Sequence, residues 1–139
     1  KGYRFAIKLG EKTPAGRIPS TLVIGTDHPK FPILRKTFYT QKGIACLPDQ
    51  MFFGQIPKQP RRGSILLSRP EKDFKITKIE SEHPNFTATS TAVRGNWEYR
   101  INVEFDGKGD YGMVESGLII HTDDPKQPKI RVPLRAVIR

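Results

Sequence analysis

Residues 112–139 read GMVESGLIIHTDDPKQPKIRVPLRAVIR, and this stretch indicates two β-strands joined by a turn. Apolar and polar residues alternate from Lys129 onward, which places the apolar side chains on one face of an extended strand. These apolar residues are Ile130, Val132, Leu134, Ala136 and Ile138. In the turn we expect Asp123 to hydrogen-bond its own backbone and Pro125 to preset φ for the reversal. Pro133 lacks an amide hydrogen, so we expect this last strand at a sheet edge or with a bulge there.

The same pattern occurs near the start of the chain, where residues 16–40 read GRIPSTLVIGTDHPKFPILRKTFYT. A shift of 96 positions aligns the two stretches, with thirteen identical residues among the first forty positions and no gap. Residues 1–40 are therefore predicted to be the last three strands of a module whose complete copy occupies residues 41–139. Lys36 is a departure from the repeat, because it occupies the position at which Val132 faces the core.

Strand patterns continue through the complete module. The segment from Trp97 to Phe105 alternates in the same way, with five apolar side chains on one face. Further strands are expected at 51–56, 64–68, 74–79, 86–93 and 114–121, which makes seven with 97–105 and the final strand. Seven is the number in a constant-type immunoglobulin sandwich. The predicted fold class is all-β: an immunoglobulin-like seven-stranded β-sandwich, preceded by the last three strands of a second copy.

This organisation leaves the first copy incomplete. Three strands with one apolar face cannot bury that face alone. The missing half is expected from residues outside this sequence, from the following module, or from another chain. The last possibility predicts an oligomer formed by strand complementation.

Length and charge restrict the classes of function. The 139 residues suffice for one ordinary domain and part of another, and no run approaches the ~20 apolar residues that a transmembrane helix needs. No signal-peptide pattern is present at the start, although an upstream signal is possible for a chain that begins within a domain. The net charge of +10 comes mostly from residues 1–40, with eight Lys or Arg against two Asp or Glu. The complete module is only mildly basic, which argues against specific nucleic-acid binding.

Several motifs resemble a known family. The stretch PDQMFFGQI at 48–56 resembles the first strand of bacterial immunoglobulin-like domains of unknown function, which are related to Hydin-like and major-sperm-protein-like sandwiches. Residues 65–67, the apolar positions of 74–79 and the hairpin 117–133 resemble the strands that follow in that family. The resemblance covers about residues 43–138, and 3–40 in part. It implies a non-catalytic, extracytoplasmic scaffold or adhesion-type module (periplasmic, cell-surface or secreted), often in tandem copies.

Catalytic, metal and cofactor chemistry find little support in the sequence. His28, His83 and His121 each fall in a turn or at a strand end, and the first and last are not shared by the two copies. No His or Cys pair has zinc spacing, and no glycine-rich phosphate loop is present. The carboxylates of Asp106, Asp110, Asp123 and Asp124 could bind calcium, but solvated turn carboxylates are the favoured interpretation. Cys46, the only cysteine, is expected to be a buried, inert thiol. We therefore predict no enzyme, no catalytic residue, no cofactor and no metal.

Two surfaces remain as candidates for binding a partner. The first is the basic row on the outward face of the last strand, formed by Lys129, Arg131, Arg135 and Arg139, with Arg61 and Arg62 adding positive charge elsewhere. The second is the edge of that strand, which could pair with a strand of another chain. The hypothesis that follows is a structural or protein-interaction module that positions partners or self-associates. The alternatives are an accessory subunit of a larger extracytoplasmic enzyme complex or lattice, and a polyanion- or carbohydrate-binding module.

Overall fold

A computed structural model describes residues 2–139, which divide into two compact units, one ending at Gly43 and the other running from Ile44 to Arg139. Every regular element in this range is a β-strand, so the protein is all-β as predicted. No helix suited to crossing a membrane occurs among these residues.

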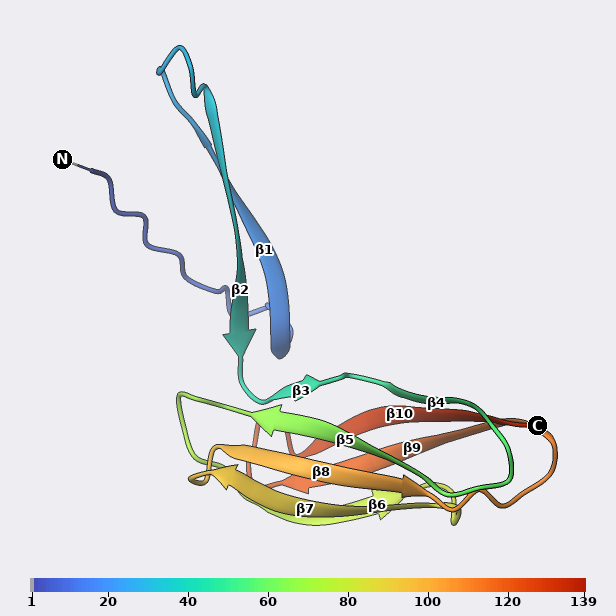
Figure 1. Ribbon diagram of the computed structural model, residues 1–139. Coiled ribbons are helices and arrows are strands. Elements are labelled where there is room, and N and C mark those ends of the chain that lie inside the picture. The colour runs from blue at the N-terminus through green and yellow to red at the C-terminus, as the bar shows by residue number, and fades with distance from the viewer. Residues whose placement is uncertain (1) are drawn as a thin grey trace. The chain divides into compact units, whose positions relative to one another are not determined.

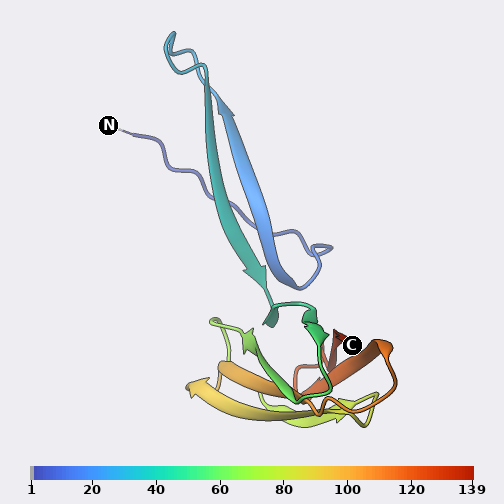
Figure 2. The same cartoon turned by 45° about the vertical axis from the view of Figure 1, so that its right-hand side comes forward.

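The first unit is a single antiparallel hairpin (Figure 2). Strand β1 (Gly16–Gly25) pairs with β2 (Ile33–Lys42) along their whole length, with Gly16 opposite Lys42 and Gly25 opposite Ile33. The prediction of three strands was wrong, because residues 2–15 form no strand. The Lys42 ammonium group instead donates hydrogen bonds to three carbonyl oxygens of this segment, at Gly10, Glu11 and Thr13.

The second unit consists of two four-stranded sheets that face each other (Figure 1). One sheet has the order β3-β5-β8-β7 and the other β4-β10-β9-β6. The strands are β3 (Ala45–Leu47), β4 (Met51–Ile56), β5 (Arg61–Ser68), β6 (Ile76–Ser81), β7 (Phe86–Arg94), β8 (Glu98–Phe105), β9 (Gly112–Thr122) and β10 (Lys129–Ile138). All seven strands predicted for this module are present. The predicted number was wrong by one, because the three residues of β3 are too few to show a period in sequence.

The core lies between the two sheets and comes from the inward positions of the alternating strands. Ile101, Val103 and Phe105 of β8 are buried against the inward side chains of β10, namely Val132, Leu134, Ala136 and Ile138. Phe86 and Phe105 pack ring on ring with centroids 4.8 Å apart. Packing the apolar faces of the two sheets against each other removes both faces from water, and this burial is the main driving force for forming a sandwich.

The predicted edge position of the last strand was wrong. Strand β10 pairs with β9 on one side and runs parallel to β4 on the other, and its bulge lies between Arg135 and Val137 rather than at Pro133. The neighbouring β9 residue Gly117 uses its carbonyl oxygen to accept a hydrogen bond from Glu82, so its backbone points away from Pro133. The backbone nitrogen of Pro133, which has no hydrogen to donate, therefore faces the β4 side of β10. The pairing with β4 begins one residue later, at Leu134, so no ladder hydrogen bond is lost.

The hairpins β1–β2 and β9–β10 share their local geometry. Shifting the first by 96 positions reproduces the pairing register of the second, and both begin at a glycine with positive φ, 122° at Gly16 and 127° at Gly112. Both turns are closed by a threonine amide that donates to a proline carbonyl, at 2.9 Å from Thr26 and 3.0 Å from Thr122. The repeat found in the sequence thus corresponds to a repeated hairpin structure.

Candidate functional site

Three members of the basic row, Lys129, Arg131 and Arg135, lie on the outward face of β10, Arg139 follows the end of that strand, and all four side chains are exposed. Two of them are compensated by carboxylates of neighbouring strands. Arg131 forms a two-point ion pair with Glu82, at 2.9 and 2.7 Å, and Arg135 pairs with Glu115 at 3.0 Å. Lys129 and Arg139 have no ion pair within residues 2–139. The row is therefore part of a surface of mixed charge rather than a continuous positive stripe.

Two carboxylates on this face, those of Glu80 and Glu82, have pKa values that their hydrogen-bond partners lower. Hydrogen bonds from Arg131 hold the pKa of Glu82 below its ordinary value. Hydrogen bonds from Lys78 and then from His121 lower the pKa of Glu80 in the same way. Both carboxylates are thus ionised at neutral pH, which keeps the local charge of the face close to balance.

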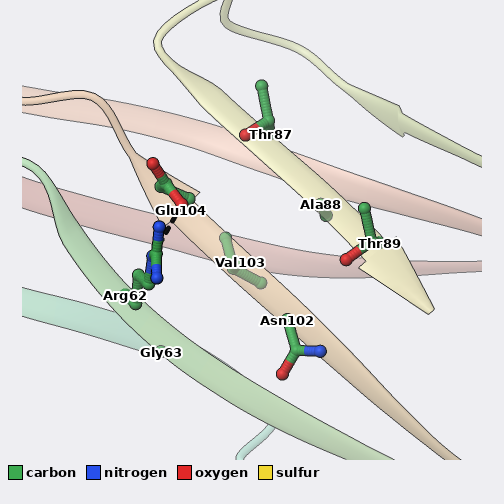
Figure 3. Close-up of a pocket in the computed structure, with 8 residues that line it drawn as sticks. All are labelled: Arg62, Gly63, Thr87, Ala88, Thr89, Asn102, Val103 and Glu104. Atoms are coloured by element: carbon green, nitrogen blue, oxygen red, sulfur yellow. Dashed lines mark hydrogen bonds and ion pairs between the residues drawn. The ribbon is translucent and has the colours of Figure 1, made fainter. Parts of the chain in front are cut away.

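Arg61 and Arg62 lie at the start of β5, in the other sheet. The Arg62 guanidinium pairs with Glu104 of β8 at 2.7 Å beside a shallow groove of about 390 Å³ (Figure 3). Thr87, Thr89 and Asn102 also line this groove. The six basic residues predicted to bind a partner are therefore divided between two sheets, and the fold does not gather them into one site.

An apolar depression next to Arg135 was not predicted. Its volume is about 490 Å³, and Phe52 of β4 and Met113 of β9 line it with 63% and 67% of their surfaces exposed. In sequence both residues occupy outward positions of their strands, and large apolar residues at such positions are the signal that indicates this surface.

The turn between β9 and β10 is fixed to other parts of the module. Asp123 does not cap its own turn as predicted, because its carboxylate accepts the amide of Lys75 at 2.7 Å. Asp124 takes the capping role by accepting the amide of Lys126 at 2.9 Å. Asp124 also forms a buried ion pair with Arg69, with the two side chains 5% and 17% exposed. The interpretation of these residues as solvated turn carboxylates was wrong for Asp124.

The turn is also tied to the start of the module. Gln127 accepts the amide of Ile44 at 2.7 Å and donates to the carbonyl oxygen of the same residue at 3.0 Å. Together with Arg69 and Lys75, these bonds join the turn to the segments before β3, after β5 and before β6. The chemistry of this cluster is structural, since its polar groups satisfy one another.

The three histidines each contact a neighbouring backbone or side-chain group. His28 and His83 bond to backbone amides within their own turns, and His121 contacts Glu80 at 2.7 Å. Among residues 2–139 no group of three or more His, Cys, Asp or Glu side chains is placed to hold a metal ion.

Cys46 is half-buried in β3, and its thiol lies 3.3 Å from the carbonyl oxygen of Pro48. Burial, with a smaller contribution from the charge of Asp49, raises the pKa of this thiol from 9.0 to about 12. At pH 8 its thiolate fraction is then about a thousandfold below that of an ordinary thiol. We expect Ellman's reagent to leave Cys46 unmodified in the folded protein while reacting fully in urea. A folded-state rate within tenfold of the unfolded-state rate would contradict this expectation.

The hairpin of the first unit has an apolar face that residues 2–43 leave without a second sheet. This face carries Ile18, Leu22, Ile24, Leu34 and Phe38, the counterparts of core positions in β9 and β10. Leu34 is 47% exposed, whereas its counterpart in β10, Ile130, is half-buried against the core of the second unit. Lys36 lies on the same face, opposite Leu22, so a charge interrupts the apolar surface.

Comparison with known proteins bears on the fold. No family model matches the chain, and no curated protein matches it either. A crystal structure of a protein of unknown function from Porphyromonas gingivalis W83 is similar with a TM-score of 0.58 and 12% identity, over 93% of this chain and 69% of that one. A Bacteroides ovatus GH5 xyloglucanase in complex with a XXXG heptasaccharide aligns with 70% of this chain and 19% of its own, with 9% identity and a TM-score of 0.48, too weak to support an argument. The chain thus has an all-β, sandwich-like fold that resembles the Porphyromonas protein.

Proposed function

We propose that this chain is a non-catalytic assembly module, made of an immunoglobulin-like sandwich and part of a tandem copy, that associates through its uncovered β-surfaces. The strand orders β3-β5-β8-β7 and β4-β10-β9-β6 support the immunoglobulin-like assignment. If β3 and β4 are two halves of the first strand, these orders correspond to the ABED and CFG sheets of a constant-type domain. The matching register of the two hairpins supports the tandem copy.

The apolar face of the first hairpin is the observation that carries the proposal. An isolated two-stranded hairpin is marginally stable in water. On this face Leu34 is exposed and Phe38 and its apolar neighbours are only half-buried, with no second sheet over them in residues 2–43. Burying that face against a second β-layer would stabilise the hairpin through the hydrophobic effect. The layer that we propose is the same face of another copy of the chain. An address outside the cytoplasm belongs to the proposal too, and rests on the family resemblance alone.

The assembly is tested by light scattering on the purified chain across a concentration series. We expect a dimer or larger species in the wild type and at least tenfold weaker association in Phe38→Asp, because the new carboxylate would be buried in the contact. Tyr39→Asp is the matched control: it places the same charge one residue further along β2, on the opposite face of the hairpin. We expect this control to associate like the wild type.

Two results would contradict the proposal. A wild-type chain that is monomeric at every concentration would exclude self-assembly. Equal effects of Phe38→Asp and Tyr39→Asp would show that the apolar face is not the contact, and that added negative charge acts at long range instead.

A further inference from the structure

Strand β7 forms one end of the sheet β3-β5-β8-β7, and its outer edge has no neighbouring strand in residues 2–139. We infer that this edge pairs antiparallel with β7 of a second copy, which joins two sheets into one of eight strands. This inference rests on the proposed assembly function and adds a second contact, separate from the hairpin.

The hydrogen-bonding direction of β7 follows from its pairing with β8. Asn85 accepts the amide of Asp106 at 3.0 Å, so the backbone of Asn85 points towards β8. Directions alternate along an antiparallel strand, so Thr87 and Thr89 also point towards β8 while Ala88 and Ser90 point outward. The Phe86 amide agrees, because it turns away from β8 and donates to His83. The outward groups of Ala88 and Ser90 meet no other strand of the described chain, so they are available to a partner.

The composition of β7 leaves this edge unprotected. Residues 86–93 read FTATSTAV, without a charge, proline or glycine. Such an edge, long and high in β-propensity, is a template for another strand. Its bulge lies between Ala92 and Arg94, at the far end of the strand.

Every other edge in the described chain carries a feature that hinders pairing. Strand β6 has Lys78 and Glu80 at its centre, and β3 is three residues long. Strand β4 contains Gly54 with φ 81°. In the first unit, β1 carries an arginine and a proline, and β2 carries adjacent arginine and lysine residues. The identity of the occupant follows from this contrast: residues 86–93 of β7 are the uncharged exposed strand segment in the described chain that could pair with this edge.

A second copy of β7 fits this edge by symmetry. With Thr89 on the two-fold axis, residues 86–92 pair with 92–86 of the partner, and Arg94 stays outside the paired segment. Threonine then lies opposite threonine on the outer face, and Ala88 lies opposite Ser90 on the other face. Cross-strand threonine pairs stabilise a sheet, and the small residues beside them leave room for close approach. No like charges lie opposite each other in this pairing, so the net charge of +10 on each chain causes no close repulsion at the contact.

The inference is tested first with Ser90→Pro in the full chain. Proline removes an outward amide that β8 does not use, so the fold should persist while pairing across the edge weakens at least tenfold. Ser90→Thr keeps the amide and should associate like the wild type. The two contacts together predict a pattern of assembly sizes. With both contacts intact, the chain forms species larger than a dimer. Ser90→Pro or Phe38→Asp alone should give dimers, and the double variant should give monomers.

Disulfide trapping locates the contact. In the proposed register Thr89 faces Thr89 of the partner in a non-hydrogen-bonded pair, with Cα atoms about 4.5 Å apart, a distance that a disulfide can bridge. Thr89→Cys should therefore form a covalent dimer on oxidation. Thr91→Cys is the control, because its copies would lie four residues apart along the strands, about 14 Å, beyond disulfide reach.

Association of Ser90→Pro like the wild type, or equal cross-linking of Thr89→Cys and Thr91→Cys, would overturn pairing through β7. If Phe38→Asp alone gives monomers and the β7 variants have no effect, the proposed assembly through the hairpin stands and this inference fails. If Phe38→Asp has no effect while Ser90→Pro gives monomers, β7 is the contact and the hairpin proposal fails.

Discussion

Phe105→Ala is expected to lower the free energy of unfolding of the second unit by about 4 kcal/mol, because it leaves a cavity at the centre of the sandwich. The Phe105 ring is fully buried and packs on Phe86, with Phe53 at a centroid distance of 6.3 Å. Since domains of this size are stable by only about 5–15 kcal/mol, the variant would be close to unfolding. Urea denaturation followed by fluorescence measures the effect on this unit alone, because Trp97 is the only tryptophan in the chain.

The control for this cavity is Phe52→Ala, which removes the same ring from an exposed position of β4. We expect a change below about 0.5 kcal/mol, as for most surface substitutions. A cost below 1 kcal/mol for Phe105→Ala would mean that the two sheets do not enclose Phe105 as described.

Asp124→Ala is the second large effect, with an expected loss of about 3 kcal/mol. The substitution leaves the largely buried Arg69 guanidinium without its partner and removes the cap on the Lys126 amide. Removing one partner of a buried ion pair costs more stability than the pair itself contributes, because the charge that remains, here on Arg69, stays partly desolvated and unpaired. The same urea titration gives the value.

A double-mutant cycle separates these contributions. Replacing Arg69 by methionine in the Asp124→Ala background removes the unpaired charge, so it should recover part of the stability. Glu115→Ala is the control: it breaks the exposed pair with Arg135 and is expected to cost less than about 0.5 kcal/mol. If Asp124→Ala and Glu115→Ala cost the same, the Arg69 pair contributes no more than a surface ion pair.

The alternation of apolar and polar residues was enough to predict most of the strands. It predicted β4 and β10 with their observed bounds, and β8 within one residue of its start. It predicted the repeated hairpin as well, because a shift of 96 positions needs no knowledge of the tertiary fold. The alternation of apolar and polar residues cannot be recognised in a very short segment, so β3 was missed. It also fails where burial depends on a partner, so residues 2–15 were wrongly assigned a strand.

The candidate surfaces were harder to predict, because sequence indicates which residues point outward but not what lies beside them. Arg131 and Arg135 were correctly placed on an outward face, yet Glu82 and Glu115, which neutralise them, are distant in sequence or on another strand. Asp124 reads as a turn residue, and only the approach of Arg69, 55 positions away, buries its carboxylate. The open edge of β7 likewise depends on the order of strands in a sheet.

By itself the sequence determined the all-β class, the inward face of each long strand and the repeated hairpin, because these depend on local period and turn chemistry. Only the tertiary structure decided which strands are edges, which charges are paired and which apolar face lacks a cover. Those properties arise from contacts between residues far apart in the chain, and a linear pattern does not contain them. For this protein they place β10 inside a sheet and β7 at its end.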